Sequence, residues 1–189
     1  MSTKLMIIVG TVRPGRIGIS IADWVRAHAE ATDGIDVDVV DLLELNLPFM
    51  DEPAHPMRRE YTQPHTIAWS ERVDAADAII LISPEYNHSY SPVLKNAIDY
   101  LAHEWRKKPV GFVSYGGVSA GTRGVAALKP VVAVVGMVPV GSAVEINYPS
   151  KLVDDEGRFT PDERAEASLT AQLKELAAMS DALTPLRVP

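Results

Sequence analysis

The chain has 189 residues, 47% of them hydrophobic and 23% charged, so we expect residues 1–189 to form a single globular domain with a sizeable core. The formal net charge of -7 gives it no global electrostatic reason to bind nucleic acid or an anionic membrane. The absence of cysteine excludes disulfides, Cys-ligated metal sites and thiol catalysis.

The first predicted strand is the apolar run 5–9, which follows a short start with too few apolar residues for a signal peptide. A helix is predicted next, because Ile17, Ile21 and Val25 recur at helical spacing, together with Trp24 and His28. A second strand is predicted at 35–40. No later apolar run reaches the roughly 18 residues that span a bilayer. We therefore expect a cytoplasmic protein without a membrane segment.

The middle of the chain begins with an irregular stretch at 41–63 that is rich in proline. Ile67 and Val73 then indicate a helix, and the continuous apolar run 78–82 indicates the third strand. Ser91 and Pro92 are suited to the N-cap and first position of a further helix. Its apolar face is formed by Leu94, Ile98 and Leu101.

The last part of the chain is predicted to contain strands at 110–113 and 143–146, separated by a helix at about 120–136 that Pro130 should bend or split. After a second irregular stretch at 147–159, Thr160 is the expected N-cap of a final helix, with Pro161 and Glu163 in its first turn. This helix should end near Leu183. The alternation of strands and helices is typical of a doubly wound α/β sandwich.

The loop after the first strand, Gly10 to Gly18, leads into a helix N-terminus, where free backbone N–H groups favour a phosphate. Thr11 adds a hydroxyl, while Arg13 and Arg16 add positive charge. The loop therefore favours a phosphomonoester site. The alternative is a tight turn with solvated arginines. The sequence has neither the G-x-G-x-x-G pattern of a dinucleotide site nor the Gly-Lys-Ser/Thr of a P-loop.

Two further loops follow the third and fourth strands: the aromatic and polar stretch Pro84 to Tyr90, and the glycine-rich stretch Val113 to Gly121. In an open parallel sheet ligands bind at the carboxyl ends of the strands, and in the order 2-1-3-4-5 the first, third and fourth strands are neighbours. The three loops should therefore converge on one crevice.

The chain resembles the NADPH-dependent FMN reductase family over roughly residues 4 to 140, in three blocks. The first is Gly10-Thr11-x-Arg13-x-Gly15, the second is Pro84-Glu85-Tyr86-Asn87 with Ser91-Pro92-x-Leu94-Lys95-Asn96-Ala97-Ile98-Asp99-Tyr100, and the third is Lys107-Lys108-Pro109-Val110 leading to Gly116-Gly117. The second block is the specific one, and the other two support it. The resemblance implies a flavodoxin-like three-layer α/β/α sandwich with a five-stranded parallel sheet in the order 2-1-3-4-5.

The resemblance also implies an FMN-dependent NAD(P)H oxidoreductase, which passes hydride from NADPH or NADH through flavin to a flavin, quinone, azo compound or similar small acceptor. It implies a cofactor site made of Thr11, Arg13, Arg16, Ile17, Gly18, Pro84, Glu85, Tyr86, Asn87, Ser114, Gly116 and Gly117. No catalytic side chain is expected, because the flavin performs the chemistry. The family's phosphate loop commonly has serine, serine and asparagine where this chain has Thr11, Arg16 and Gly18.

Several side chains near the second loop have more than one interpretation. Backbone N–H groups of Tyr86 and Asn87 are candidates for contacting the reactive edge of the ring. Glu85 either pairs with a base across a subunit interface or is solvated. The resemblance implies a homodimer or homotetramer, for which the apolar residues of the following helix are candidate contacts: Leu94, Ile98, Leu101 and Trp105.

Competing functions differ in their chemistry. A flavodoxin-like electron carrier would bind FMN without direct turnover of NAD(P)H, and a non-catalytic interaction module would bind no flavin. The five histidines show no metal-ligand spacing. Ser114 lies outside any G-x-S-x-G elbow, so a hydrolase triad is also disfavoured.

Overall fold

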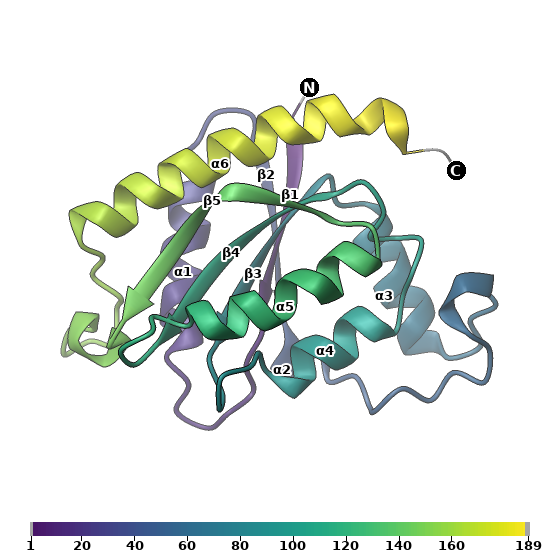
Figure 1. The fold of residues 1–189 in the computed structure, drawn as a ribbon, viewed down its shortest axis with the longest axis horizontal. Coiled ribbons are helices and arrows are strands. Elements are labelled where there is room, and N and C mark those ends of the chain that lie inside the picture. The colour runs from purple at the N-terminus through teal and green to yellow at the C-terminus, as the bar shows by residue number, and fades with distance from the viewer. Residues whose placement is uncertain (1, 188–189) are drawn as a thin grey trace.

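The computed structural model describes residues 2–187 and contains one parallel sheet with strand order β2-β1-β3-β4-β5 (Figure 1). The strands are β1 Thr3–Val9, β2 Ile35–Asp41, β3 Ala78–Pro84, β4 Pro109–Gly116 and β5 Val138–Asn147. The predicted α/β class and strand order are confirmed. Because β1, β3 and β4 adjoin, their carboxyl ends and the loops that follow them meet at one edge of the sheet.

Helices cover both faces of the sheet and complete the predicted three-layer sandwich (Figure 1). On one face lie α1 Gly18–Glu30 and α6 Glu163–Leu183, and on the other lie α3 Pro64–Asp74, α4 Pro92–Asp99 and α5 Thr122–Val134. The irregular stretch after β2 contains the short helix α2 Leu42–Leu45. No helix within residues 2–187 combines the length and apolar character needed to cross a bilayer.

The continuous apolar runs of the central strands reflect burial on both faces. In β1, Met6 and Ile8 pack toward α3, α4 and α5, whereas Ile7 and Val9 pack toward α1 and α6. Each strand residue therefore faces a covered surface, which explains the absence of polar alternation.

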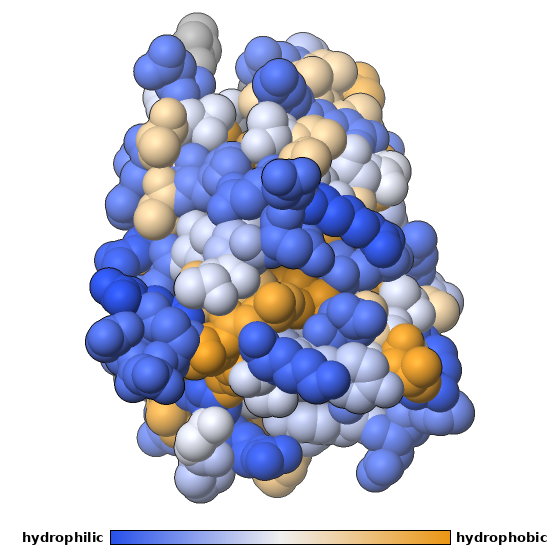
Figure 2. All heavy atoms as spheres, turned by 90° about the vertical axis from the view of Figure 1, so that its left-hand side faces the viewer, coloured by the Kyte–Doolittle hydropathy of each residue, from blue (hydrophilic) through white to orange (hydrophobic). Residues whose placement is uncertain are grey.

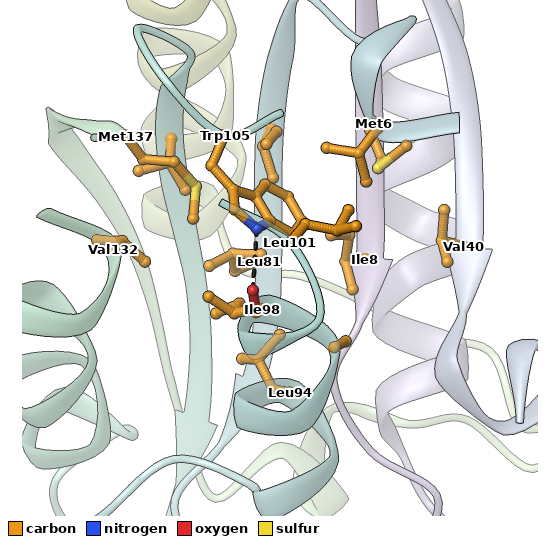
Figure 3. Packing of buried hydrophobic residues seen from close by; sticks show 14 of the residues in the cluster. Met6, Ile8, Val40, Leu81, Leu94, Ile98, Leu101, Trp105, Val132 and Met137 are labelled. Carbon is orange, nitrogen blue, oxygen red and sulfur yellow. Dashed lines mark hydrogen bonds between the residues drawn. The ribbon is translucent and has the colours of Figure 1, made fainter. Parts of the chain in front are cut away.

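The prediction that apolar residues of α4 and the segment after it form a subunit contact is wrong for the four side chains named. Leu94, Ile98, Leu101 and Trp105 are at most 2% exposed and belong to the core between the sheet and α4 (Figure 3). The indole Nε1 of Trp105 donates to the carbonyl oxygen of Ile98 at 3.0 Å, which ties the segment after α4 to that helix. These side chains are therefore buried within the chain's own core and present no surface to a second subunit.

Two helix predictions are corrected. The split predicted as one alternative at Pro130 does not occur, because α5 continues through this residue as one helix; Pro130 is exposed, while Leu128 and Val132 remain packed in the core on either side of it. The carbonyl group that loses its helical partner can then bond to water. The N-cap of α6 is Asp162, whose carboxylate accepts from the Ala165 N–H at 2.7 Å, and not Thr160. The predicted end at Leu183 is confirmed.

β5 begins at Val138, earlier than the predicted start at residue 143. An edge strand with an irregular register can accommodate Pro139. The pairing of β4 with β5 shifts between Val110 and Phe112. At the shift, the buried Gln172 of α6 donates to the carbonyl oxygens of Phe112 at 3.0 Å and Ser142 at 2.8 Å. A Cβ on Gly111 would lie 2.7 Å from the Gln172 side chain, so a glycine is needed there.

Candidate functional site

A cleft of about 670 Å³ lies at the carboxyl ends of β1, β3 and β4. Of the predicted site residues, six line it: Thr11, Arg13, Arg16, Ile17, Pro84 and Tyr86. The remaining lining residues were not predicted as site residues: Gly15, Ser20, Tyr115, Pro149, Ser150, Val153 and Gly157. Four of these residues, Pro149, Ser150, Val153 and Gly157, belong to the segment after β5, which forms one wall of the cleft and lies at the left in Figure 1. Figure 2 shows that side, where an apolar band lies between hydrophilic residues.

The helix α1 opens toward this cleft with its first N–H groups uncapped. Its N-cap residue, Ile17, supplies no side-chain hydrogen bond, and its first turn contains no acidic residue. By contrast, α2, α4 and α6 are capped by Asp41, Ser91 and Asp162. Free N–H groups and the positive end of the helix dipole together favour an anion at α1.

Arg13 adds a solvent-exposed positive charge to this end of the cleft. Its side chain is exposed and forms no ion pair with any residue in the range 2–187. Ser20, in the first turn of α1, lines the same cleft with a hydroxyl group. An arginine, a hydroxyl and uncapped N–H groups form a donor set that fits a phosphate monoester.

Arg16 has a different environment from Arg13. Its guanidinium forms a bidentate pair with Asp41 at the end of β2, and its Nη1 also donates to the carbonyl oxygen of Thr11 at 2.5 Å. Burial opposes ionisation of Asp41, but the hydrogen bonds from Arg16 and from the Leu43 N–H outweigh it and hold the pKa of that carboxyl below its usual value. Arg16 therefore fixes the loop after β1 to β2.

Gly18 does not line the cleft, but it allows β4 to approach the start of α1. A Cβ at this position would lie 2.6 Å from the hydroxyl oxygen of Tyr115 and 2.7 Å from Cγ2 of Thr11. Tyr115 is 6% exposed, and its burial raises the pKa of its phenol, which stays protonated at neutral pH. The only sequence signal for Tyr115 was its place at the carboxyl end of β4, just before Gly116.

The loop after β3 forms a tight turn whose aromatic residue faces the loop after β1. The Tyr86 hydroxyl lies 3.0 Å from Oγ1 of Thr11. Tyr86 and Ser89 exchange two backbone hydrogen bonds around Asn87 and His88, whose positive φ values are typical of a type I′ turn. The Tyr86 N–H is thus already used, contrary to its predicted role toward a ring, whereas the Asn87 N–H finds no acceptor among the described residues.

Glu85 points away from the cleft, toward the start of α5. Its carboxylate pairs with Arg123 of the same chain and its side chain is only 6% exposed. Both sequence interpretations, a pair across a subunit interface and a solvated charge, are therefore wrong. The reason is that α5 begins next to this loop in space, a proximity that the sequence does not display.

The glycine-rich loop after β4 is close to the cleft without lining it. Ser114 is buried and donates to the carbonyl oxygen of Ala120 at 2.9 Å, and the Gly116 carbonyl oxygen accepts from the Tyr148 N–H at 2.8 Å. Gly117 is open, since a Cβ added there would have no other atom within 4 Å. The structure thus brings six predicted residues together and leaves the others outside the lining: Gly18, Glu85, Asn87, Ser114, Gly116 and Gly117.

A second cleft, of about 870 Å³, lies at the opposite, amino-terminal edge of the sheet. Its basic residues largely have internal partners: Arg59 pairs with Asp74 and Glu104, and Nζ of Lys108 donates to the carbonyl oxygens of Val73 and Asp74. These contacts hold segments of the fold together. The cleft beside α1 is the better candidate site, because its donors face open space.

Comparison with known proteins gives one family match. The sequence model of the NADPH-dependent FMN reductase family matches residues 3–149. An NAD(P)H-dependent FMN reductase of Schizosaccharomyces pombe is 40% identical over 123 residues, which are 64% of this chain and 62% of that protein. The chain thus spans less than two thirds of that relative. An FMN-dependent NADPH-azoreductase of Staphylococcus aureus is 28% identical over 161 residues, 85% of this chain and 81% of that protein.

The solved structures with similar folds are more distant in sequence. FerB, a flavoenzyme NAD(P)H:(acceptor) oxidoreductase from Paracoccus denitrificans, has a TM-score of 0.75 at 22% identity and covers 96% of this chain and 98% of its own. The apo form of an NADH:FMN oxidoreductase has a TM-score of 0.66 at 19% identity, covering 96% and 90%. At these identities the likeness shows the flavodoxin-like fold alone.

Proposed function

Because the chain belongs to the NADPH-dependent FMN reductase family, we propose that it is an FMN-dependent oxidoreductase. It passes hydride from NADPH or NADH through FMN to a small acceptor such as a flavin, a quinone or an azo compound. The observation that carries this proposal is the uncapped N-terminus of α1 beside Arg13, in a cleft that also contains Tyr86 and Tyr115. Such a cleft has donors for one phosphate and flat side chains for a ring.

We assign the site residues by their place in the cleft. Arg13, Thr11, Ser20 and the first N–H groups of α1 bind the FMN phosphate, and Ile17, Pro84, Tyr86 and Tyr115 contact the rest of the flavin. The Asn87 N–H donates to the polar edge of the ring. Gly18 and Gly116 allow neighbouring segments to approach closely, and Gly117 leaves open space beside the loop after β4. Arg16, Glu85 and Ser114 hold the loops. Bound FMN supplies the hydride transfer, and these residues bind and orient it.

The names of the relatives favour a reductase over an electron carrier. The similar proteins are named NAD(P)H-dependent FMN reductases and FMN-dependent NADPH-azoreductases, so each name includes a nicotinamide cofactor. We therefore propose direct turnover with NAD(P)H and no need for a partner protein.

The visible spectrum of the purified protein tests this function. FMN is added first, and NADPH is then added under anaerobic conditions. We expect the flavin absorbance to bleach without any partner protein and to return when a quinone or azo dye is added. A flavin that stays oxidised would indicate a carrier, and a protein that does not bind FMN would overturn the proposal.

We further propose that residues 1–189 act as one FMN-binding unit in a cytoplasmic homodimer or homotetramer. The absence of cysteine is compatible with a reducing compartment. Exposed apolar side chains support self-association: Phe49 is 85% exposed, and Met50 next to it lies along α4, where its N–H donates to Oδ1 of Asn96 at 3.2 Å. Sedimentation equilibrium tests the assembly state.

Arg13→Ala is expected to weaken FMN binding by about tenfold or more, since a charge-assisted hydrogen bond contributes about 1.5–3 kcal/mol. Riboflavin, which lacks the phosphate, should bind equally well to the variant and the unmodified protein. Fluorescence titration of both flavins measures the effect. Arg26→Ala is the control, because Arg26 lies further along α1, the helix that follows the Arg13 loop, in an exposed pair with Asp23. Equal loss of riboflavin binding would contradict a phosphate role.

A further inference from the structure

The helix α5 is capped by a residue from another loop. Its own N-cap, Gly121, has no side chain and a φ of 84°. In its place, Oε2 of Glu85 accepts from the N–H groups of Arg123 at 3.1 Å and Gly124 at 3.4 Å. The same oxygen accepts from the Ser119 hydroxyl at 2.8 Å. A carboxylate at this place complements the helix dipole and satisfies the first-turn donors.

Arg123 completes the environment of this carboxylate. Its Nε and Nη2 lie 2.7 and 2.6 Å from Oε1 of Glu85, so both guanidinium donors reach the same oxygen. Desolvation opposes the charge, but the hydrogen bonds from Ser119 and Arg123 outweigh it, so the pKa of Glu85 lies below its usual value. Both oxygens of Glu85 are therefore charged and fully engaged at neutral pH.

Glycines bring the same segments into backbone contact. A Cβ on Gly124 would lie 3.0 Å from the carbonyl oxygen of Ser89, at the end of the turn after β3. A Cβ on Gly116 would lie 3.1 Å from the Gly121 nitrogen and 3.5 Å from Cβ of Glu85. The loop after β3, the loop after β4 and the start of α5 thus pack as one unit around the Glu85 carboxylate.

We propose that Glu85 is a positioning residue that sets the spacing between the two walls of the flavin-ring site. Tyr86 follows it directly in the chain, and the Glu85 N–H donates to the carbonyl oxygen of Tyr115 at 3.1 Å. Tyr86 and Tyr115 both line the cleft. The inference rests on the proposed function, because it assigns these walls to FMN, but the loop coupling itself does not require the cofactor.

Glu85→Gln tests the coupling in the protein without FMN. The variant keeps the shape of the side chain but places an amide NH₂ among donors. Hydrogen exchange should become at least about tenfold faster at the N–H groups of Arg123, Gly124, Tyr86 and Ser89. Glu175→Gln is the matched control, since Glu175 accepts from the Gly141 and Ser142 N–H groups, each at 2.8 Å, on β5. In the control only the exchange at β5 should change.

The flavin is measured in the same two variants. For Glu85→Gln we expect an FMN dissociation constant at least about tenfold higher and an altered visible circular dichroism spectrum at saturating FMN. Glu175→Gln should lower thermal stability without changing either property. If Glu85→Gln speeds exchange only at Arg123 and Gly124 and binds FMN unchanged, Glu85 is a helix cap alone and the proposal is overturned.

The two proposals fail separately. If the unmodified protein binds no FMN, the proposed function is wrong and so is the assignment of the walls to a flavin. The exchange experiment would then still decide whether Glu85 couples Tyr86 and Ser89 to α5. If FMN binds and bleaches with NADPH but exchange at Tyr86 and Ser89 is unchanged in Glu85→Gln, only the positioning role is overturned.

Discussion

Gly18→Ala is expected to remove most FMN binding while leaving the protein folded. The new methyl group would meet the Tyr115 hydroxyl at 2.6 Å and Cγ2 of Thr11 at 2.7 Å, so the start of α1 must move away from β4. Overpacking of this kind costs about 1–3 kcal/mol. If it destabilises the FMN-bound conformation by that amount relative to the free protein, the affinity for FMN falls by up to about 100-fold. Fluorescence titration with FMN measures the dissociation constant.

A second substitution separates this clash from other causes. In Gly18→Ala/Tyr115→Phe the nearest atom is removed, so part of the lost affinity should return. Gly141→Ala is the control, because a Cβ there would meet only the carboxylate of Glu175, with Oε1 nearest at 3.4 Å, far from the cleft along β5. Wild-type affinity in Gly18→Ala, or no recovery in the double variant, would show that close approach of Tyr115 to α1 is unimportant for the flavin.

The layered fold was predictable because its signal is repeated along the chain. Each central strand contributes to both cores, as Met6 and Ile7 do on opposite faces, so apolar runs mark the strands directly. The apolar pattern did not predict the first part of the edge strand β5. That part contains Pro139 and pairs irregularly with β4, where Gln172 of α6 bonds to the Phe112 carbonyl oxygen. Edge strands lose part of their pattern because one side of their backbone has no neighbour.

The position of the candidate site was also predictable, but the partners of its charged residues were not. The three loops are brought together by strand order, which the sequence indicates. Arg16 and Glu85 look like ligand contacts in the sequence, yet they reach Asp41 and Arg123, which are 25 and 38 residues away. A long polar side chain takes the partner that tertiary packing brings near, and local spacing contains no information about that partner.

The wall formed by Ser150, Val153 and Gly157 was missed for another reason. These residues lie in an irregular stretch just beyond the family match, which ends at residue 149. The stretch is placed by packing at its end, where Phe159 lies 5.2 Å from Trp24 of α1 between ring centroids. Trp24 thus helps to position the wall formed by Ser150, Val153 and Gly157. The loop before α1 lines the same cleft.

Arg16→Met is expected to destabilise the protein by about 3–5 kcal/mol, because it leaves the carboxylate of Asp41 buried without its partner. The side chains of Arg16 and Asp41 are 11% and 8% exposed, so water cannot easily replace the pair. Urea unfolding at pH 7 measures the change. Arg16→Met/Asp41→Asn should recover much of the loss, since the double variant has no unpaired buried charge. Equal instability of the single and double variants would contradict this account.

The difference in unfolding free energy between the unmodified protein and Arg16→Met should depend on pH with a defined sign. In the unmodified protein the pKa of Asp41 is lowered from 3.8, so the unfolded chain takes up a proton there more readily than the folded protein. The contribution of the pair is therefore fully present above pH 3.8 and is lost as the pH falls through the lower folded value. In Arg16→Met, Asp41 is buried without its partner, which favours the protonated form of its carboxyl. The difference in unfolding free energy between the unmodified protein and Arg16→Met should therefore become smaller as the pH falls. A gap that stays constant from pH 7 down to about pH 3 would mean that the stability comes from packing of the Arg16 side chain and not from its charge.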